Sequence, residues 1–237
     1  MDMKVRPGMS FDVPRYLSLQ PLFQEMSAAE LTRLAEGCSL SRLLRGDMLF
    51  RVGEPCDAFH VTVTGQVKLF ALSPNGQEKV IEICAPGQSF AEALMFTGRP
   101  YIINAQALTD ALVLSIGKAA VLGEIARDTR FALRMLAGIS RRLHGLVHDV
   151  QAYALQSGMQ RVIGYLLRDL ADENDPGQGS ITVSLPVSKA TIASRLSLTP
   201  EYFSRVLHEL EAEGLVRIDK RDVHILDPRR LAQYQAT

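Results

Sequence analysis

The pattern of apolar and polar residues changes twice along the chain. From Cys38 to Ile116, short runs rich in β-branched and aromatic residues alternate with regularly spaced glycines. The runs are Met48–Arg51, Phe59–Thr64, Gln66–Leu72, Glu78–Cys84, Ala105–Leu108 and Ala111–Ile116. Many short strands separated by turn residues are typical of an antiparallel sandwich or barrel. The sequence therefore predicts an all-β domain in this half of the chain.

A long amphipathic helix is predicted next, from Thr129 to Ala154, with Asp128 as its N-cap. Two sets of residues recur there at seven-residue intervals, offset by three, as in the a/d seam of a coiled coil. They are Leu136, Leu143 and Val150 in the first set, and Ile139, Leu146 and Tyr153 in the second. A helix buried in its own domain is the alternative. Polar residues on the other faces, such as Arg141 and Asp149, favour a dimer seam.

Two capping boxes mark further helix starts. Ser27 and Glu30 begin a short helix, and Ser157 and Gln160 begin another that is followed by a polar loop from Asp172 to Ser180. These signals place a β domain at 20–127, a dimerisation helix at 128–156 and a C-terminal domain at 157–237.

The segment from Ser188 to Glu213 predicts a helix-turn-helix. Ser188 can cap a helix over Lys189–Leu196, and Thr199 followed by Pro200 is a strong start for a second helix. The buried face of that second helix is predicted to be Phe203, Val206, Leu207 and Leu210, with Gly214 as its stop. Leu215–Ile218 and Val223–Leu226 then predict a hairpin wing. The second helix of this motif enters the major groove of DNA.

Glu201, Ser204 and Arg205 lie opposite that buried face, so they would point toward the groove. An arginine can donate to O6 and N7 of guanine, and a glutamate can accept from the amino group of cytosine. A serine can bond a base edge or contact a thymine methyl. The alternative is a solvated amphipathic helix in a protein that does not bind DNA.

Composition changes this picture only in part. The net charge is zero, and from Gly158 onward ten Lys and Arg face eleven Asp and Glu. DNA binding must therefore depend on where the charges lie, since phosphates are neutralised by Lys and Arg. The sequence has neither a run of 18 apolar residues nor a secretion signal, so we expect a cytoplasmic protein without a membrane span. The three cysteines form no CxxC pair and are expected to be core residues.

Four stretches together resemble the cyclic-AMP receptor / fumarate-nitrate regulator (CRP/FNR) family. They are Gly65–Lys68, Gly87–Phe96, the heptad helix and Thr199–Arg205, and the resemblance spans roughly Met26 to Leu226. It implies an α+β fold in which a double-stranded β-helix (jelly-roll) sensor is followed by a dimerising helix and a winged helix-turn-helix. It also implies a homodimeric transcription regulator that acts on double-stranded DNA with RNA polymerase, and no enzyme activity or catalytic residue.

The E-x-x-S-R pattern of Glu201, Ser204 and Arg205 resembles the fumarate-nitrate branch in particular. That resemblance implies a TTGAT half-site, repeated in inverse orientation after four unspecified base pairs. Ser188 and Thr199, with the neighbouring Lys189, match family positions that contact phosphates.

The effector does not follow directly from the family. No cysteine precedes Cys38, which argues against the branch's iron–sulfur cluster. Cyclic-nucleotide members use a Gly-Glu pair and an Arg-Ser pair, where this chain has Ala91-Glu92 and Tyr101-Ile102. A cyclic phosphate buried without its arginine would lack a counter-charge, so cyclic AMP is not expected. If the alignment contained a gap, Arg99, two residues before Tyr101, would instead take the position of that arginine.

The apolar run from Phe90 to Phe96 resembles the dissimilatory nitrate respiration regulator subgroup. This implies a haem that responds to nitric oxide and a role in anaerobic or nitrogen-oxide respiration. The expected effector pocket comprises Phe90, Ala91, Glu92, Leu94, Met95, Tyr101 and Ile102. His144, on the long helix, is the candidate haem ligand.

Three rival interpretations remain open at this stage. The regulator could respond to another small ligand, or to thiol redox through Cys38, Cys56 or Cys84. A cupin-like metalloenzyme would need several histidines on strands, and only His60 lies on a predicted strand. A kinase-type regulatory subunit would bind a nucleotide without DNA, and the E-x-x-S-R helix argues against it.

Overall fold

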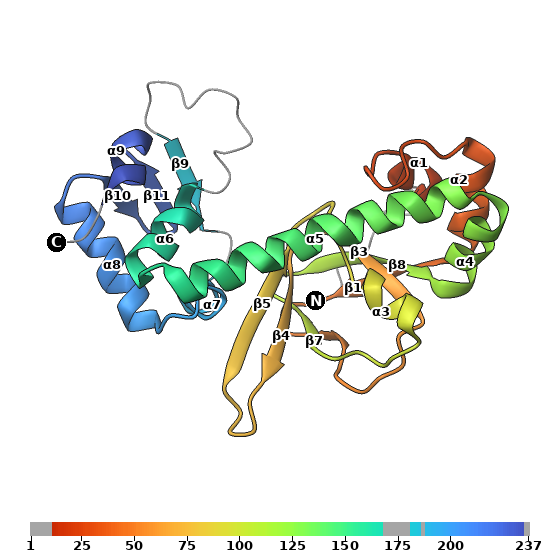
Figure 1. Ribbon diagram of the computed structural model, residues 1–237, viewed down its shortest axis with the longest axis horizontal. Coiled ribbons are helices and arrows are strands. Elements are labelled where there is room, and N and C mark those ends of the chain that lie inside the picture. Colours follow the sequence, from red (N-terminus) through yellow and green to blue (C-terminus); the bar gives the residue numbers. More distant parts are fainter. Residues whose placement is uncertain (1–10, 168–180, 186–187, 235–237) are drawn as a thin grey trace, which may run out of the picture. The chain divides into compact units, whose positions relative to one another are not determined.

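The computed structural model describes residues 11–167, 181–185 and 188–234 (Figure 1). The chain divides into two compact units, one of Met1–Leu69 with Ile83–Arg142 and one of Phe70–Glu82 with Leu143–Thr237. The predicted loop Asp172–Ser180 lies outside the described residues. The domain limits drawn from the sequence stay a prediction.

Two four-stranded sheets form the β-sandwich that the sequence predicts. One has the order β1 (Cys38–Leu43), β8 (Ala111–Gly117), β3 (Ala58–Thr64) and β6 (Ser89–Phe90). The other has the order β2 (Met48–Phe50), β7 (Asn104–Ala107), β4 (Val67–Leu72) and β5 (Glu78–Cys84). The six predicted strands are confirmed to within one residue at either end, and β1 and β6 are additional. Strands β1 and β3 both pair antiparallel with β8.

Helices pack against part of the first sheet. They are α1 (Val13–Ser18), α2 (Ala28–Glu36), α4 (Lys118–Arg127) and the first part of α5 (Thr129–Leu155), while the short α3 (Glu92–Thr97) follows β6. The Ser27 capping box of α2 is confirmed, because Glu30 accepts a hydrogen bond from the Ser27 amide at 2.6 Å. The ring of Phe23 lies 6.4 Å from that of Phe59 on β3 and 5.9 Å from that of Phe131 on α5. This aromatic layer holds the helices on the sheet.

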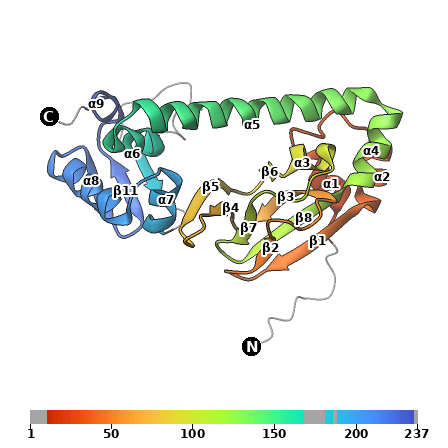
Figure 2. The same cartoon turned by 60° about the horizontal axis from the view of Figure 1, so that its bottom comes forward.

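Helices α2 and α4 lie side by side at one end of β1 and β8 (Figure 2) and share a buried carboxylate. Arg33 donates to both oxygens of Glu124, at 2.9 and 2.7 Å, and Arg127 donates to Glu124 from the next turn. The Glu124 side chain is only 4% exposed. The hydrogen bonds from Arg33, with a smaller contribution from Arg127, hold the pKa of Glu124 below its ordinary value despite burial. The ionised carboxylate therefore stabilises the packing of α2 against α4.

We expect Glu124→Gln to destabilise the protein near neutral pH and to lose this effect in acid. A lowered pKa in the folded state gives stability that is present above the unfolded pKa of about 4.3 and is lost as the pH falls through the lower folded value. Urea midpoints of the wild type and the variant should therefore differ at pH 7 and converge once the pH falls below the lowered folded-state pKa of Glu124. Glu36→Gln, at an exposed position of α2, is the control. A difference between the two urea midpoints that stays constant with pH would contradict the role of the Glu124 charge.

The second unit contains the predicted helix-turn-helix and wing. Its elements are α6 (Gly158–Leu167), β9 (Ile181–Ser184), α7 (Lys189–Arg195), α8 (Pro200–Ala212), β10 (Val216–Asp219), β11 (Asp222–Ile225) and α9 (Pro228–Gln233). The wing strands lie within one residue of their predicted limits, and β9 joins them in a sheet of order β10-β11-β9. The capping box at the start of α6 is confirmed by hydrogen bonds between Ser157 and Gln160.

The long helix is also as predicted, since α5 spans Thr129–Leu155 without a break. Asp128 accepts a hydrogen bond from the Arg130 amide at 2.9 Å at its start. Within the described part of the chain, no helix is both long and apolar enough to cross a membrane.

Candidate nucleic-acid interface

The caps of α7 and α8 set the geometry of the helix-turn-helix. Ser188 accepts from the Thr191 amide at 3.2 Å, and Thr199 accepts from the Tyr202 amide at the same distance. Pro200 occupies the first turn of α8, where a missing amide hydrogen costs nothing. Ser197, in the connection, adopts a left-handed conformation with φ of 56°. Both predicted N-caps are confirmed.

The predicted buried face of α8 is confirmed. Phe203, Leu207 and Leu210 are fully buried, and Val206 is 2% exposed. Helix α8 packs against α7, α6 and β10, so these four side chains fix its orientation in the domain. Within this domain, the described residues leave Glu201, Arg205 and His208 on the opposite face exposed.

Glu201 and Arg205 are exposed on that opposite face, and Ser204 is partly exposed beside them. The structure thus brings the three predicted base-reading side chains together on one surface of α8. The Arg205 guanidinium lies 5.5 Å from the centre of the Tyr202 ring, a contact that the sequence reasoning did not consider.

The three predicted phosphate contacts lie at the starts of the two helices. Ser188 and Thr199 are exposed, and Lys189 is partly exposed in the first turn of α7. Helix N-termini attract anions through their free amides and the helix dipole. The placement of these residues therefore suits a DNA backbone.

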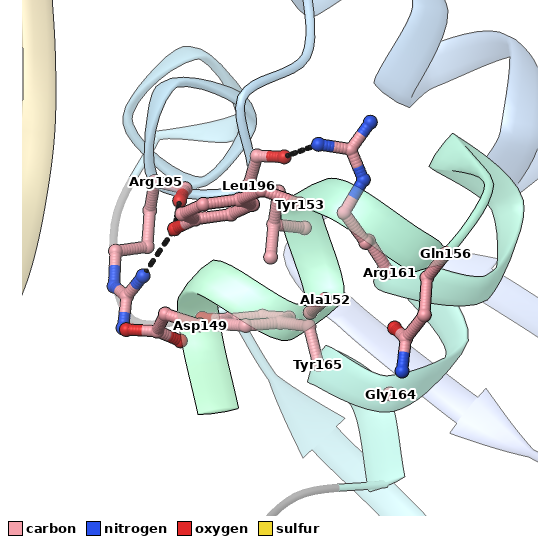
Figure 3. Close-up of a pocket in the computed structure, with 9 residues that line it drawn as sticks. All are labelled: Asp149, Ala152, Tyr153, Gln156, Arg161, Gly164, Tyr165, Arg195 and Leu196. Carbon is pink, nitrogen blue, oxygen red and sulfur yellow. Dashed lines mark hydrogen bonds and ion pairs between the residues drawn. The ribbon is translucent and has the colours of Figure 1, made fainter. Parts of the chain in front are cut away.

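A polar cluster joins α7 to the end of α5 within the second unit (Figure 3). Arg195 donates to Asp149 at 2.6 Å and to the Tyr153 hydroxyl at 2.6 Å, and that hydroxyl donates to the Arg195 carbonyl at 2.7 Å. Arg161 donates to the Leu196 carbonyl at 2.8 Å. These groups line a cavity of about 140 Å³ with Gln156 and Tyr165. The cluster ties the first helix of the helix-turn-helix to α5.

The sequence assigned Tyr153 to the dimer seam and did not identify this cluster. Its hydroxyl is bonded to α7 of its own chain, so at least that part of the side chain has an intramolecular role. The only local indication of this cluster in the sequence was the spacing of Asp149 and Tyr153, which lie four residues apart on one face of the helix. Arg195 is 46 residues away from Asp149, so no local pattern connects the two.

We expect Asp149→Ala to loosen α7. The Arg195 side chain is 15% exposed, and without its carboxylate it would keep only the Tyr153 hydroxyl as a side-chain partner in this cluster. Leaving a largely buried charged donor without its partner costs about 1–3 kcal/mol. Amide exchange in α7 should accelerate accordingly, whereas Asp219→Ala, at an exposed wing position, should leave it unchanged. Equal exchange in both variants would show that the ion pair contributes nothing.

Apolar side chains are exposed along α5 at the predicted seam. Leu136 is 57% exposed, Leu143 59%, Leu146 40% and Val150 65%, and Ile139 is partly buried. A row of exposed leucines on one helix is unfavourable in water and is typical of an interaction surface.

The predicted effector residues lie in different environments. Phe90 and Met95 are fully buried and Tyr101 is 5% exposed, whereas Ile102 is 65% exposed. Ala91, Glu92 and Leu94 are partly buried. The Tyr101 ring stacks on Phe50 with centres 3.7 Å apart. Tyr101 therefore fills space between the two sheets.

His60 forms the polar centre of a second aromatic cluster, with Phe50, Phe90 and Tyr101, which the sequence reasoning missed. Its ring nitrogens lie 2.9 Å from the Tyr101 hydroxyl and 2.9 Å from Ser115 Oγ. Burial lowers the pKa of His60 to about 4. The imidazole is therefore neutral at physiological pH and engaged on both sides. His144, in contrast, is exposed on α5.

Glu92 also has a partner. Arg142 of α5 lies 3.8 Å from its carboxylate and donates to the Ser89 carbonyl at 2.6 Å. Ala91, which precedes it, is in a left-handed conformation with φ of 69°. Only glycine adopts this conformation without a cost, so the loop keeps the geometry of a glycine turn although an alanine occupies it.

Comparison with known proteins gives consistent matches over both halves of the chain. Residues 40–128 match a family described as the cyclic nucleotide-binding domain, and residues 160–234 match the Crp-like helix-turn-helix domain. The crystal structure of DNR from Pseudomonas aeruginosa is 34% identical, with a TM-score of 0.51, over 96% of this chain and all of that one.

Two more distant relatives agree. FixK2 from Bradyrhizobium japonicum is 21% identical with a TM-score of 0.74, over 84% of this chain and 98% of that one, and supports the fold. A CRP-like cAMP-activated global transcriptional regulator from Mycobacterium tuberculosis is 24% identical over 90% of this chain and 95% of its own length.

Proposed function

Because the chain belongs to the CRP/FNR family of DNA-binding transcription regulators, we propose that it reads palindromic TTGAT-type operators as a homodimer. One observation carries this proposal. Helix α8 presents Glu201, Ser204 and Arg205 to solvent on the face opposite its buried apolar residues. A carboxylate, a hydroxyl and a guanidinium on one face of a recognition helix have the chemistry to read base edges.

Each side chain is assigned a distinct role. Arg205 donates to O6 and N7 of the half-site guanine, and Glu201 accepts from a cytosine amino group on the opposite strand. Ser204 contacts a thymine methyl or base edge. Ser188, Lys189 and Thr199 contact phosphates, which position the helix without reading sequence.

Two features support the proposed homodimer: the exposed apolar row of α5 and the symmetry of the proposed operator. Members of this family are usually dimeric, and the exposed apolar row Leu136, Leu143 and Val150 supplies a self-complementary seam. Two protomers related by a two-fold axis match a palindrome whose half-sites are about one helical turn apart. As in the family, the bound dimer acts with RNA polymerase.

The proposal is tested with the full chain and a fluorescent duplex carrying TTGAT, four base pairs and ATCAA. We expect affinity for this operator to exceed that for a scrambled duplex of the same composition by at least about 10³-fold at matched salt. Equal affinities would refute the proposed operator. Salt must be held constant, because phosphate contacts alone make affinity depend steeply on it.

For the effector we propose haem-dependent sensing of nitric oxide, in a regulator of anaerobic or nitrogen-oxide respiration. When bound, haem supplies an iron that binds nitric oxide. Phe96 and Ile102, 42% and 65% exposed, offer apolar side chains that suit a porphyrin, and half-buried Leu94 lies in the same segment. Both ring nitrogens of His60 are engaged, so His60 is not proposed as a ligand, and His144, which is exposed on α5, stays the candidate predicted from the sequence.

Haem titration followed by absorbance tests this effector. We expect a saturable shift of the haem spectrum with the wild type, a different spectrum with His144→Ala, and an operator affinity that changes when nitric oxide is added to the haem-loaded protein. No saturable binding would refute haem, and unchanged operator affinity would refute nitric oxide sensing. Either result would leave the operator proposal intact.

Competing effectors find less support in the sensor. At the place where cyclic-nucleotide members carry their Arg-Ser pair, the Tyr101 ring stacks on Phe50 and its hydroxyl lies 2.9 Å from His60, and Glu92 lies 3.8 Å from Arg142. Thiol redox requires thiolate, yet burial raises the pKa of Cys38 to about 11 and also raises that of Cys56. Cys84 is fully buried. We therefore do not assign the signal to a cyclic nucleotide or to a cysteine.

A further inference from the structure

Tyr202 lies at the point where α8 meets the start of α6. It is half-buried, one residue after Glu201 and three before Arg205, so its ring and the Arg205 side chain share one face of the helix. The Arg205 guanidinium carbon is 5.5 Å from the ring centre, which is within the range of a cation–π contact.

The edge of the Tyr202 ring lies against a glycine. A Cβ built on Gly158, the first residue of α6, would lie 2.5 Å from Tyr202 Cε1 and 3.0 Å from both Tyr202 Cζ and Leu198 Cδ2. A separation of 2.5 Å is shorter than real Cβ contacts, so a side chain at position 158 would force the ring to shift. The ring therefore packs directly against the backbone of α6, in space that exists only because residue 158 has no side chain.

The backbone of Tyr202 is fixed as well. Its amide donates to the Thr199 hydroxyl at 3.2 Å, as part of the α8 cap. The cap thus fixes the backbone of Tyr202, the edge of its ring lies at Gly158, and one face of the ring meets Arg205.

We propose that Tyr202 is a positioning residue for base reading, which holds the Arg205 guanidinium ready for guanine, and that Gly158 holds the ring in place. This inference rests on the proposed function of Arg205. A flexible arginine must lose side-chain freedom when it binds a base, and that loss weakens binding. An aromatic face that restricts the conformations of the guanidinium before DNA binds removes part of this loss of side-chain freedom. It does so only for the contacts that Arg205 makes.

The consequence is a loss of base preference rather than a general loss of DNA binding. Exposed cation–π contacts are worth about 0.5–1 kcal/mol, which corresponds to roughly two- to five-fold per half-site. Tyr202→Leu should therefore lower by that factor the preference for a TTGAT half-site over one in which the guanine pair is replaced. Tyr202→Phe keeps the ring and should keep the preference. Affinity for random DNA should not change in either variant.

Gly158→Ala provides a second route to the same effect. The added methyl group should displace the ring and lower guanine preference in the same way, although alanine favours helix more than glycine does. In a Tyr202→Leu background the same change should have little further effect, because both act through one ring. Additive losses in the double variant would show that Gly158 acts elsewhere.

Arg205→Ala, measured in parallel, separates this inference from the proposed function. If Arg205→Ala leaves guanine preference intact, the proposed reading by Arg205 fails, and the role of Tyr202 fails with it. Suppose instead that Arg205→Ala removes the guanine preference. The positioning role alone is then overturned if Tyr202→Leu keeps the full preference, or if Tyr202→Leu lowers the affinities for operator and random DNA equally. The expected result is loss with Arg205→Ala, partial loss with Tyr202→Leu and no loss with Tyr202→Phe.

Discussion

Replacing Leu143 with aspartate should convert the protein to a monomer and lower operator affinity by about 10²–10⁴-fold. Leu143 is 59% exposed in the middle of the α5 seam, with Leu136 and Val150 one heptad away on either side. A carboxylate in a desolvated helix interface has no partner there, and burying it without one is costly. A monomer also loses the gain from two linked half-site contacts, which is of the stated size.

Leu155→Asp is the matched control for this prediction. Leu155 is 81% exposed on the same helix, but it lies five residues after Val150 and outside the a/d positions. It should leave both the oligomeric state and operator binding unchanged. Sedimentation equilibrium measures the first and fluorescence anisotropy the second. A dimer that survives Leu143→Asp would show that the seam lies elsewhere.

The second large effect is expected at the reading face. Arg205→Ala should cost about 1–3 kcal/mol per half-site on the TTGAT operator, because a bidentate contact to guanine is worth that much in discrimination. This corresponds to roughly 5- to 150-fold in affinity for each half-site. Binding to random DNA should change little, since Arg205 is assigned to a base. Titrations against operator and random duplexes at one salt concentration measure both quantities.

Lys189→Ala gives the complementary behaviour. Lys189 lies in the first turn of α7 and is assigned to a phosphate. Its loss should weaken operator and random DNA by similar factors and reduce the salt dependence of binding by about one counterion per protomer. If Arg205→Ala behaved like Lys189→Ala, Arg205 would be a phosphate contact and the assignment of base reading would be wrong.

Elements with strong local signals were predictable from the sequence. Helix α8 begins at Pro200 because Thr199 caps it, and both the cap and the buried face follow from residue type and spacing alone. The capping boxes at Ser27 and Ser157 set the starts of α2 and α6 in the same way. Such signals act over a few residues, so they can be read without knowing the fold.

Elements that depend on distant partners were not predictable. Strand β1 carries two serines and an arginine, and it exists as a strand because it pairs along its length with β8. Helix α3 begins at left-handed Ala91 without a side-chain cap, so it has no local start signal. In the functional regions, His60 meets Tyr101 from 41 residues away and Asp149 meets Arg195 from 46 residues away.

The base-reading role of α8 is tested most directly by dimethyl sulfate protection of the operator guanines in complex with the full chain. Arg205 is assigned to N7 of guanine, the atom that the reagent methylates, so the guanine of each half-site should be protected in the complex. Guanines in the central four base pairs should react as in free DNA. If the complex forms while both half-site guanines stay fully reactive, α8 does not read the operator in the way proposed.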